Sequence, residues 1–161
     1  MSSSTLTTRI NRLALWLAAA LFVALGLFWW RERTRHYEAP RWPLEASVSL
    51  TQAMPAIPTE RWIVAVNPEC AHCMARLAEL KRRSAAWTAD RTLGVLVVDT
   101  RTRPDSIFAG TSLDAGVWWD SLGEWRSRWG HRVYGETMVF ERGGTLVRVL
   151  APSEDPDAAL H

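Results

Sequence analysis

The sequence predicts an α/β domain, built as a mixed central sheet flanked by helices, that follows an N-terminal transmembrane helix. Three observations lead to this fold class: an uncharged apolar run near the N-terminus, a strand–helix–strand order in the middle of the chain, and a glycine-centred hairpin near its end. A strand–helix–strand order places two parallel strands in one layer, and a hairpin makes the sheet mixed. The predicted parts are a short tail (1–12), an anchor (13–30), a tether (31–60), a folded domain (61–151) and a second tail (152–161).

The apolar run from Leu13 to Trp30 is long enough to cross a bilayer, because a helix needs roughly 17–25 residues for that. A cleaved signal peptide is the alternative, but its apolar region is only ~7–15 residues long and a small-residue cleavage site should follow. Here "WWRER" follows, and tryptophans beside arginines are typical of a membrane interface. We therefore expect an uncleaved, single-pass anchor.

Charge bears on orientation and on partners. Two arginines precede the apolar run and four follow it closely, a balance that by itself would place the domain in the cytoplasm. Against this, a short N-terminal tail is typical of a signal anchor, and the cysteine chemistry favours export. Residues 42–161 hold thirteen basic and fifteen acidic side chains, so the domain is about neutral and nothing indicates binding to nucleic acid.

The strands are read from apolar runs and turn residues. Four prolines within residues 31–60 exclude a long helix there, and a short strand is predicted near Ser47–Leu50. Trp62–Val66 is apolar on both faces, as in a buried central strand, and Thr92–Thr100 predicts its parallel partner. Gly143-Gly144 predicts a two-residue hairpin loop between the last two strands.

Between the two buried strands the apolar spacing becomes helical. Cys73, Leu77 and Leu80 are expected to face the core, with Arg76 among the charged residues on the other side. The helix is therefore predicted to begin at Cys70.

A long connection separates Asp99 from Thr137, and within it Trp118, Leu122, Trp125 and Trp129 recur at helical spacing. Such a stripe can dock a partner, but aromatic residues at this spacing more often belong to a core. We therefore predict a helix that packs on the sheet.

The only two cysteines, Cys70 and Cys73, stand at the start of the predicted helix. Unpaired N–H groups and the positive end of the helix dipole favour an anion there, and His72 adds positive charge when protonated. The thiol pKa of Cys70 should therefore fall below its ordinary value. Cys73 lies one turn further along the apolar face. This asymmetry predicts that Cys70 attacks a disulfide and that Cys73 resolves the mixed disulfide.

Metal binding and haem attachment are alternatives for a CxxC pair. Structural zinc needs four ligands, and none of the four histidines (36, 72, 131 and 161) forms a second spaced pair. Covalent haem needs a histidine directly after the second cysteine, where this chain has Met74. No cofactor and no resident metal are expected; a transient copper or zinc role is the metal alternative.

A buried strand, a CxxC at a helix start, a second parallel strand, a helix and a hairpin together resemble the thioredoxin fold over about residues 61–150. The "CAHC" form is similar to the CPHC of periplasmic disulfide oxidases, and the N-terminal anchor looks like that of membrane-tethered TlpA and cytochrome-c-maturation thioredoxins. The resemblance implies a protein thiol–disulfide oxidoreductase of the bacterial inner membrane. Its domain would face the periplasm, act on exported proteins and be recycled by a membrane redox partner.

The chain departs from this family at the loop that faces the cysteines. The family has a cis-proline before the first hairpin strand, usually followed by threonine, whereas here Glu136 stands in that place and Thr137 follows. A cis bond before a residue other than proline costs about 2.5–4 kcal/mol, so a trans bond is predicted. By resemblance Glu136 and Thr137 are the substrate-binding residues. A carboxylate there would raise the thiol pKa of Cys70 and oppose His72.

Two further departures concern the family's buried acid and the long connection. Val64 occupies the acid's position, so Glu136 or Glu69 would have to accept the proton of Cys73, although Glu69 also fits a role in complementing the helix dipole. The long connection favours one dedicated substrate. The alternative function is a non-catalytic, thioredoxin-like binding or assembly factor of an envelope complex.

Overall fold

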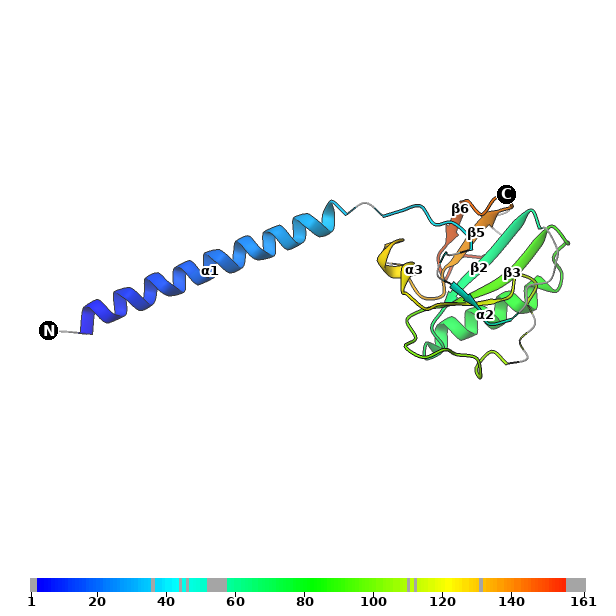
Figure 1. The fold of residues 1–161 in the computed structure, drawn as a ribbon, viewed down its shortest axis with the longest axis horizontal. Coiled ribbons are helices and arrows are strands. Elements are labelled where there is room, and N and C mark those ends of the chain that lie inside the picture. Colours follow the sequence, from blue (N-terminus) through cyan, green and yellow to red (C-terminus); the bar gives the residue numbers. More distant parts are fainter. Residues whose placement is uncertain are drawn as a thin grey trace. The chain divides into compact units, whose positions relative to one another are not determined.

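The structure is a computed structural model that describes residues 3–35, 37–43, 45, 47–51, 58–109, 111, 113–130 and 132–155. The chain divides into two compact units, Met1–His36 and Tyr37–His161 (Figure 1). The folded unit thus begins well before residue 61, because part of the predicted tether packs into it. Trp42 is buried there, and Arg41 forms a bridge with Thr145.

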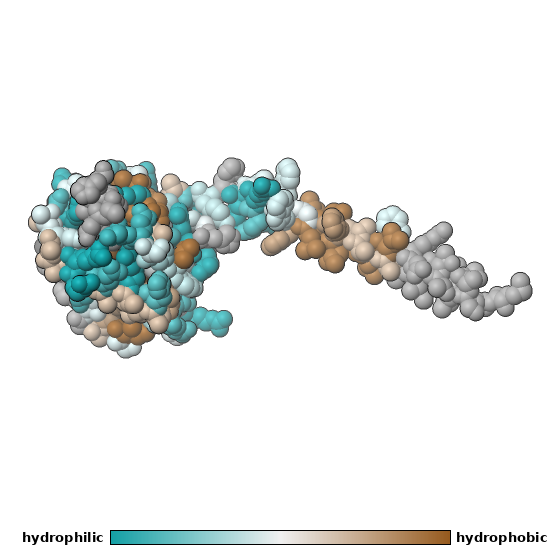
Figure 2. Space-filling model, turned by 180° about the vertical axis from the view of Figure 1, so that it is seen from behind, coloured by the Kyte–Doolittle hydropathy of each residue, from teal (hydrophilic) through white to brown (hydrophobic). Residues whose placement is uncertain are grey.

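The first unit is a single helix, α1 (Ser3–Arg33). It begins within the predicted tail, and its Ala14–Arg33 stretch is long and apolar enough to cross a membrane. Large apolar side chains along it are exposed, among them Trp16 and Phe22. Figure 2 shows a band of hydrophobic surface along the middle of this helix. The predicted apolar run is therefore a helix with the length and composition of a membrane span.

The second unit is built on a six-stranded mixed sheet in the order β1-β4-β3-β2-β5-β6. The central strands β2 and β3 are parallel, and helix α2 connects them and packs on one face of the sheet (Figure 1). The predicted strand–helix–strand order is confirmed. The elements are β1 (Ser47–Ser49), β2 (Glu60–Val66), α2 (Ala71–Ser84), β3 (Arg91–Val97), β4 (Val117–Asp120), α3 (Glu124–Ser127), β5 (Thr137–Glu141) and β6 (Leu146–Leu150).

Two core clusters lie on the two faces of the sheet, because successive side chains of a strand point to opposite faces. On the α2 face, Trp62, Val64 and Val66 of β2 pack with Cys73 and Leu80. On the other face, Ile63 and Ala65 pack with Trp125, Trp129 and Phe140. Strand β2 is therefore buried on both sides, as its apolar run predicts.

The predicted helix through the tryptophan stripe is wrong. Trp118 lies in β4 opposite Ser49, and Leu122 lies in a turn with 72% of its surface exposed. Gly123 then adopts a left-handed φ of 69° and precedes the four-residue helix α3. Helical spacing was misleading because a strand, a turn and a short helix follow one another there. The core interpretation is confirmed for Trp125 and Trp129, which are buried.

Asp120 explains where α3 begins. Its two carboxylate oxygens accept hydrogen bonds from the N–H groups of Glu124 (2.9 Å) and Trp125 (2.8 Å). These N–H groups have no partner inside a helix of this length, so the carboxylate at the end of β4 satisfies them. Burial raises the pKa of Asp120, and the two N–H groups oppose that shift.

The hairpin between β5 and β6 is confirmed, but its loop has three residues, 142–144, rather than two. The N–H of Gly144 donates to Glu141 O (2.9 Å), and the N–H of Glu141 donates to Thr145 O (3.0 Å). Gly144 has a φ of 80° and approaches Trp42 so closely that a Cβ atom would overlap the Trp42 carbonyl. A turn that ends in one left-handed glycine is a common three-residue hairpin loop.

Arg76 does not lie on the solvent side of α2 as predicted, since only 6% of its surface is exposed. Its guanidinium donates to Glu154 O (2.6 Å) and pairs with Glu79 (3.2 Å). Arg83 likewise pairs with Asp155 (2.6 Å). The chain after β6 folds back over α2 and covers Arg76, which a helical pattern cannot reveal.

Candidate active site

The two cysteines form a disulfide at the start of α2, with an S–S distance of 2.17 Å. Cys70 is the N-cap residue, and its Sγ accepts a hydrogen bond from the N–H of Cys73 (3.3 Å). A turn leads from β2 to this position, because the N–H of Cys70 donates to Asn67 O (2.9 Å) and Asn67 Oδ1 accepts from the N–H of Glu69 (2.9 Å). The prediction that the helix begins at Cys70 is confirmed.

The cysteines differ in exposure. Cys70 is half-buried, whereas Cys73 is completely buried among apolar residues that include Val64 and Val66. His72 points from the first turn of α2 into solvent. Cys70 is thus the more exposed of the two cysteines, and Cys73 is shielded. The influence of His72 on Cys70 stays a prediction.

The loop before β5 lies against Cys73. The N–H of Gly135 donates to Ala65 O (2.7 Å), and the N–H of Ala65 donates to Glu136 O (3.0 Å), so the pairing between β2 and β5 continues toward the disulfide. Gly135 has a φ of 83°, and a Cβ atom on it would lie 3.8 Å from Cys73 Cα. Among the described residues the cis bond is Trp42–Pro43, so the bond before Glu136 is trans, as predicted.

The carboxylate of Glu136 is buried and lies near Arg132, Val133 and Trp125. One oxygen accepts from the N–H of Val133 (3.4 Å), and the other lies 4.0 Å from Arg132 Nε. Burial raises the pKa of Glu136, while the Val133 N–H, Arg132 and Trp125 oppose the shift. Trp125 belongs to the core on the face opposite α2. An effect of this carboxylate on Cys70, or a role as proton acceptor, stays a prediction.

Thr137, the second predicted substrate residue, is completely buried as the first residue of β5. It pairs with Val64 of β2 and with Leu150 of β6. Thr137 therefore lies inside the sheet, directly behind the loop, and its contact with substrate stays a prediction.

Sequence reasoning missed a polar cluster beside this loop, formed by Asp99, Arg126 and Tyr134. Asp99 Oδ2 accepts from the Tyr134 hydroxyl (2.6 Å) and from Arg126 Nε (2.9 Å) and NH2 (2.7 Å). Asp99 has a left-handed φ of 54°, which is uncommon for a residue other than glycine. The one available signal was an aspartate just after a parallel strand, at the edge where sites of α/β sheets gather.

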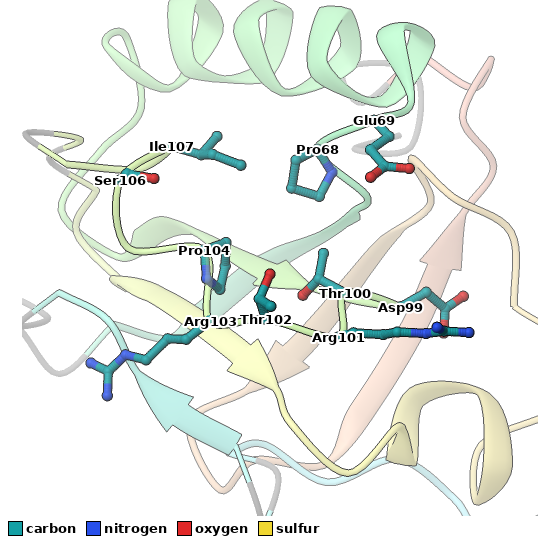
Figure 3. A pocket seen from close by; sticks show the side chains of 10 residues that line it. All are labelled: Pro68, Glu69, Asp99, Thr100, Arg101, Thr102, Arg103, Pro104, Ser106 and Ile107. Carbon is teal, nitrogen blue, oxygen red and sulfur yellow. The ribbon is translucent and has the colours of Figure 1, made fainter.

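A pocket of about 390 Å³ lies beside the start of α2. Figure 3 shows Pro68 and Glu69, which precede Cys70, across from the segment that follows β3. Arg103 points away from the hollow (Figure 3) and pairs with Asp105. The remaining lining residues are Asp99, Thr100, Arg101, Thr102, Pro104, Ser106 and Ile107. The first part of the long connection therefore forms one wall next to the accessible cysteine.

Within the described residues, no group of three or more histidine, cysteine or acidic side chains could hold a metal ion. Histidines 36, 131 and 161 lie outside the described residues.

Comparison with solved structures identifies the fold. A putative thioredoxin from Neisseria meningitidis superposes with a TM-score of 0.54 at 14% identity, covering 76% of this chain and 83% of its own. The chain has a thioredoxin-like fold. An exposed lipoprotein thioredoxin of Streptococcus pneumoniae gives a TM-score of 0.51 at 17% identity, covering 65% of this chain and 83% of its own. A thioredoxin-like protein in its oxidised form gives 0.53 at 13%, with 70% and 84% covered.

These identities are low, so the likeness of this thioredoxin-like domain concerns the fold. No protein-family model matches the sequence, and no curated protein matches it. The predicted thioredoxin-like fold with a mixed sheet is confirmed, and the close cysteine pair within it supports a redox role.

Proposed function

We propose that this protein is a membrane-anchored thiol–disulfide oxidoreductase that acts on exported proteins. The observation that carries the proposal is the Cys70–Cys73 disulfide at the N-terminus of α2, in which Cys70 is half-buried and Cys73 is fully buried. A thiol pair of this kind can exchange with a substrate while the second thiol stays protected. The apolar helix α1 supports the membrane anchor.

The exchange moves two electrons between the cysteine pair and a substrate disulfide. The thiolate of Cys70 attacks one substrate sulfur, which breaks the substrate S–S bond, forms a mixed disulfide and releases one substrate thiolate. The thiolate of Cys73 then attacks Cys70 Sγ, which forms the Cys70–Cys73 bond and releases the second substrate thiolate. The two released thiolates take up the protons that the cysteines lose, and an external dithiol must reduce the pair again. The reverse sequence oxidises a substrate dithiol.

Two features of the site support the attacking role that we propose for Cys70. Its sulfur already accepts the N–H of Cys73, and the first turn of a helix stabilises negative charge. Cys73 is surrounded by apolar side chains, a setting that disfavours its thiolate until the mixed disulfide forms.

We propose that the chain is anchored in a bacterial inner membrane and that its domain faces the periplasm. Disulfide bonds persist in oxidising compartments. The sequence holds two cysteines, so the disulfide that it can form within the chain is Cys70–Cys73. Fusing a reporter that is active only after export to the C-terminus would test the topology.

The test of function is the variant Cys73→Ala in the full chain. Without the resolving thiol, the mixed disulfide between Cys70 and a substrate should accumulate in cells. On a non-reducing gel it should run as a larger species, which disappears when a reducing agent cleaves the disulfide. The double variant with Cys70→Ala is the matched control and should trap nothing. If Cys73→Ala traps no partner through Cys70, the catalytic proposal fails.

A second candidate is a thioredoxin-like assembly factor of an envelope complex. It is favoured by Val64, which fills the position of the family's buried acid with an apolar side chain, and by Glu136 in the proline's place. This role does not need the thiols. The double Cys70→Ala, Cys73→Ala variant would then still complement a deletion strain, whereas loss of complementation at normal protein level supports the oxidoreductase.

A further inference from the structure

One carboxylate oxygen of Asp99 binds two residues that lie 27 and 35 positions further along the chain, at the edge of the sheet where the disulfide lies. Asp99 follows β3, Arg126 lies on α3, and Tyr134 begins the loop that leads to β5. Asp99 Oδ2 accepts all three hydrogen bonds, at 2.6, 2.7 and 2.9 Å. The loop is thereby tied to the end of a central strand.

Aromatic rings support the same cluster from the core side. The rings of Trp125 and Tyr134 are stacked with centroids 5.6 Å apart and planes 11° apart. The guanidinium of Arg126 lies 5.2 Å from the Trp125 ring and 5.3 Å from the Tyr134 ring. Trp125 is completely buried, so it is a rigid base for Tyr134.

The residue after Tyr134 brings the 134–136 loop into contact with the redox pair. Gly135 lies against Cys73 and pairs with Ala65 of β2. Tyr134 itself packs against the core clusters on both faces of the sheet, and one of these clusters contains Cys73 and also packs against Cys70. Glycine is the most permissive residue for the backbone, and here no proline follows it to fix φ. The position of the loop therefore depends on contacts such as those of Tyr134.

We infer that Asp99, Arg126 and Tyr134 form a clamp that positions the 134–136 loop beside the disulfide for polypeptide substrates. The three are positioning residues and act through the loop. The inference rests on the proposed oxidoreductase function. It also gives the long connection a role, because the connection contributes Trp125 and Arg126, which support a loop that has no proline to fix its backbone. Asp99 also lines the pocket that contains Pro68 and Glu69, the two residues before Cys70, so the clamp borders that pocket as well as the loop.

The test is Tyr134→Phe in the full chain held in detergent micelles. Phenylalanine keeps the ring that stacks on Trp125 and removes only the hydroxyl that donates to Asp99. The reduced protein is mixed in single turnover with a disulfide-bridged peptide and, separately, with the small aromatic disulfide of Ellman's reagent. A peptide must pass along the loop, whereas the small disulfide needs only the Cys70 thiolate.

We expect the peptide rate to fall about three- to tenfold in Tyr134→Phe, which is the effect of one hydrogen bond to a charged group weakened by solvent. The solvent correction applies because the side chains of Asp99 and Arg126 keep 26% and 42% of their exposure. The rate with Ellman's reagent should stay unchanged. Hydrogen exchange of the Gly135 amide should become faster, because the loop then opens more often.

Two variants complete the design. Tyr37→Phe, at the only other tyrosine, is the control for loss of a hydroxyl and should leave both rates unchanged. Asp99→Asn should reproduce the selective loss, since asparagine also tolerates the left-handed backbone but offers an uncharged acceptor. Unchanged peptide rates and Gly135 exchange in Tyr134→Phe, or an equal loss with both disulfides, would overturn the clamp. A wild-type protein that reacts with neither disulfide would overturn the proposed function, and the clamp with it.

Discussion

Replacing Gly135 with alanine places a measurable strain directly beside Cys73. Gly135 has a φ of 83°, and an L-residue in left-handed backbone costs roughly 1–2 kcal/mol. The added Cβ would lie 3.5 Å from Pro152 Cβ and 3.8 Å from Cys73 Cα, which are ordinary van der Waals distances, so packing should add little. We therefore expect the free energy of unfolding to fall by about 1–2 kcal/mol.

The assay is urea unfolding of the oxidised full chain in detergent, followed by fluorescence. Gly123→Ala is the matched control for backbone cost alone, because Gly123 has a φ of 69° and its Cβ would meet nothing within 4 Å. The two variants should lose similar stability. Peptide–disulfide exchange should slow by up to about tenfold in Gly135→Ala, if shifting the loop relieves the strain. Unchanged stability would refute the left-handed conformation, and a loss above about 3 kcal/mol would refute the packing distances.

Two further changes test buried carboxylates. Burial raises the pKa of Glu136, so the folded protein keeps this proton at pH values where the unfolded chain has lost it, and stability contributed by Glu136 falls as pH rises through that interval. Glu136→Gln should therefore gain stability relative to wild type in urea unfolding as pH rises above the ordinary glutamate pKa of about 4.3, and a difference that is constant or reversed with pH would contradict this. Asp120→Asn keeps one of two acceptors and should cost about 1–2 kcal/mol by leaving the N–H of Glu124 or Trp125 unpaired. The surface change Asp105→Asn is its control, with an expected cost under about 1 kcal/mol; equal losses would argue against the capping role.

The parts that could be predicted from sequence are those with a strong local pattern. Trp62–Val66 is apolar at every position, which requires burial on both faces and therefore a central strand. The CxxC lies where the pattern changes from strand to helix, so Cys70 could be placed at the N-cap. The same reasoning failed at Trp118, because residues spaced three and four apart in a strand, a turn and a short helix imitate one long helix.

Arg76 and Asp99 mark the limit of such reasoning at the site itself. Arg76 follows the polar pattern of α2, but the chain after β6 covers it and its guanidinium binds Glu154 O. Asp99 reads as an ordinary turn residue, but it receives hydrogen bonds from Arg126 and Tyr134, 27 and 35 residues further along. No local pattern contains such contacts, because they depend on which loops meet at one edge of the sheet.

The apolar helix, the central parallel strands and the position of the only cysteine pair can all be predicted from local sequence, because each depends on residues close together in the chain. The direction of the Glu136 carboxylate and the contact between Gly135 and Cys73 are set by the folded arrangement of the sheet and its loops. That arrangement also decides that α3 and the end of β3 hold the loop beside the disulfide. The physical reason is that hydrogen bonds and burial at this site join segments that sequence distance separates, so they exist only once the sheet has assembled.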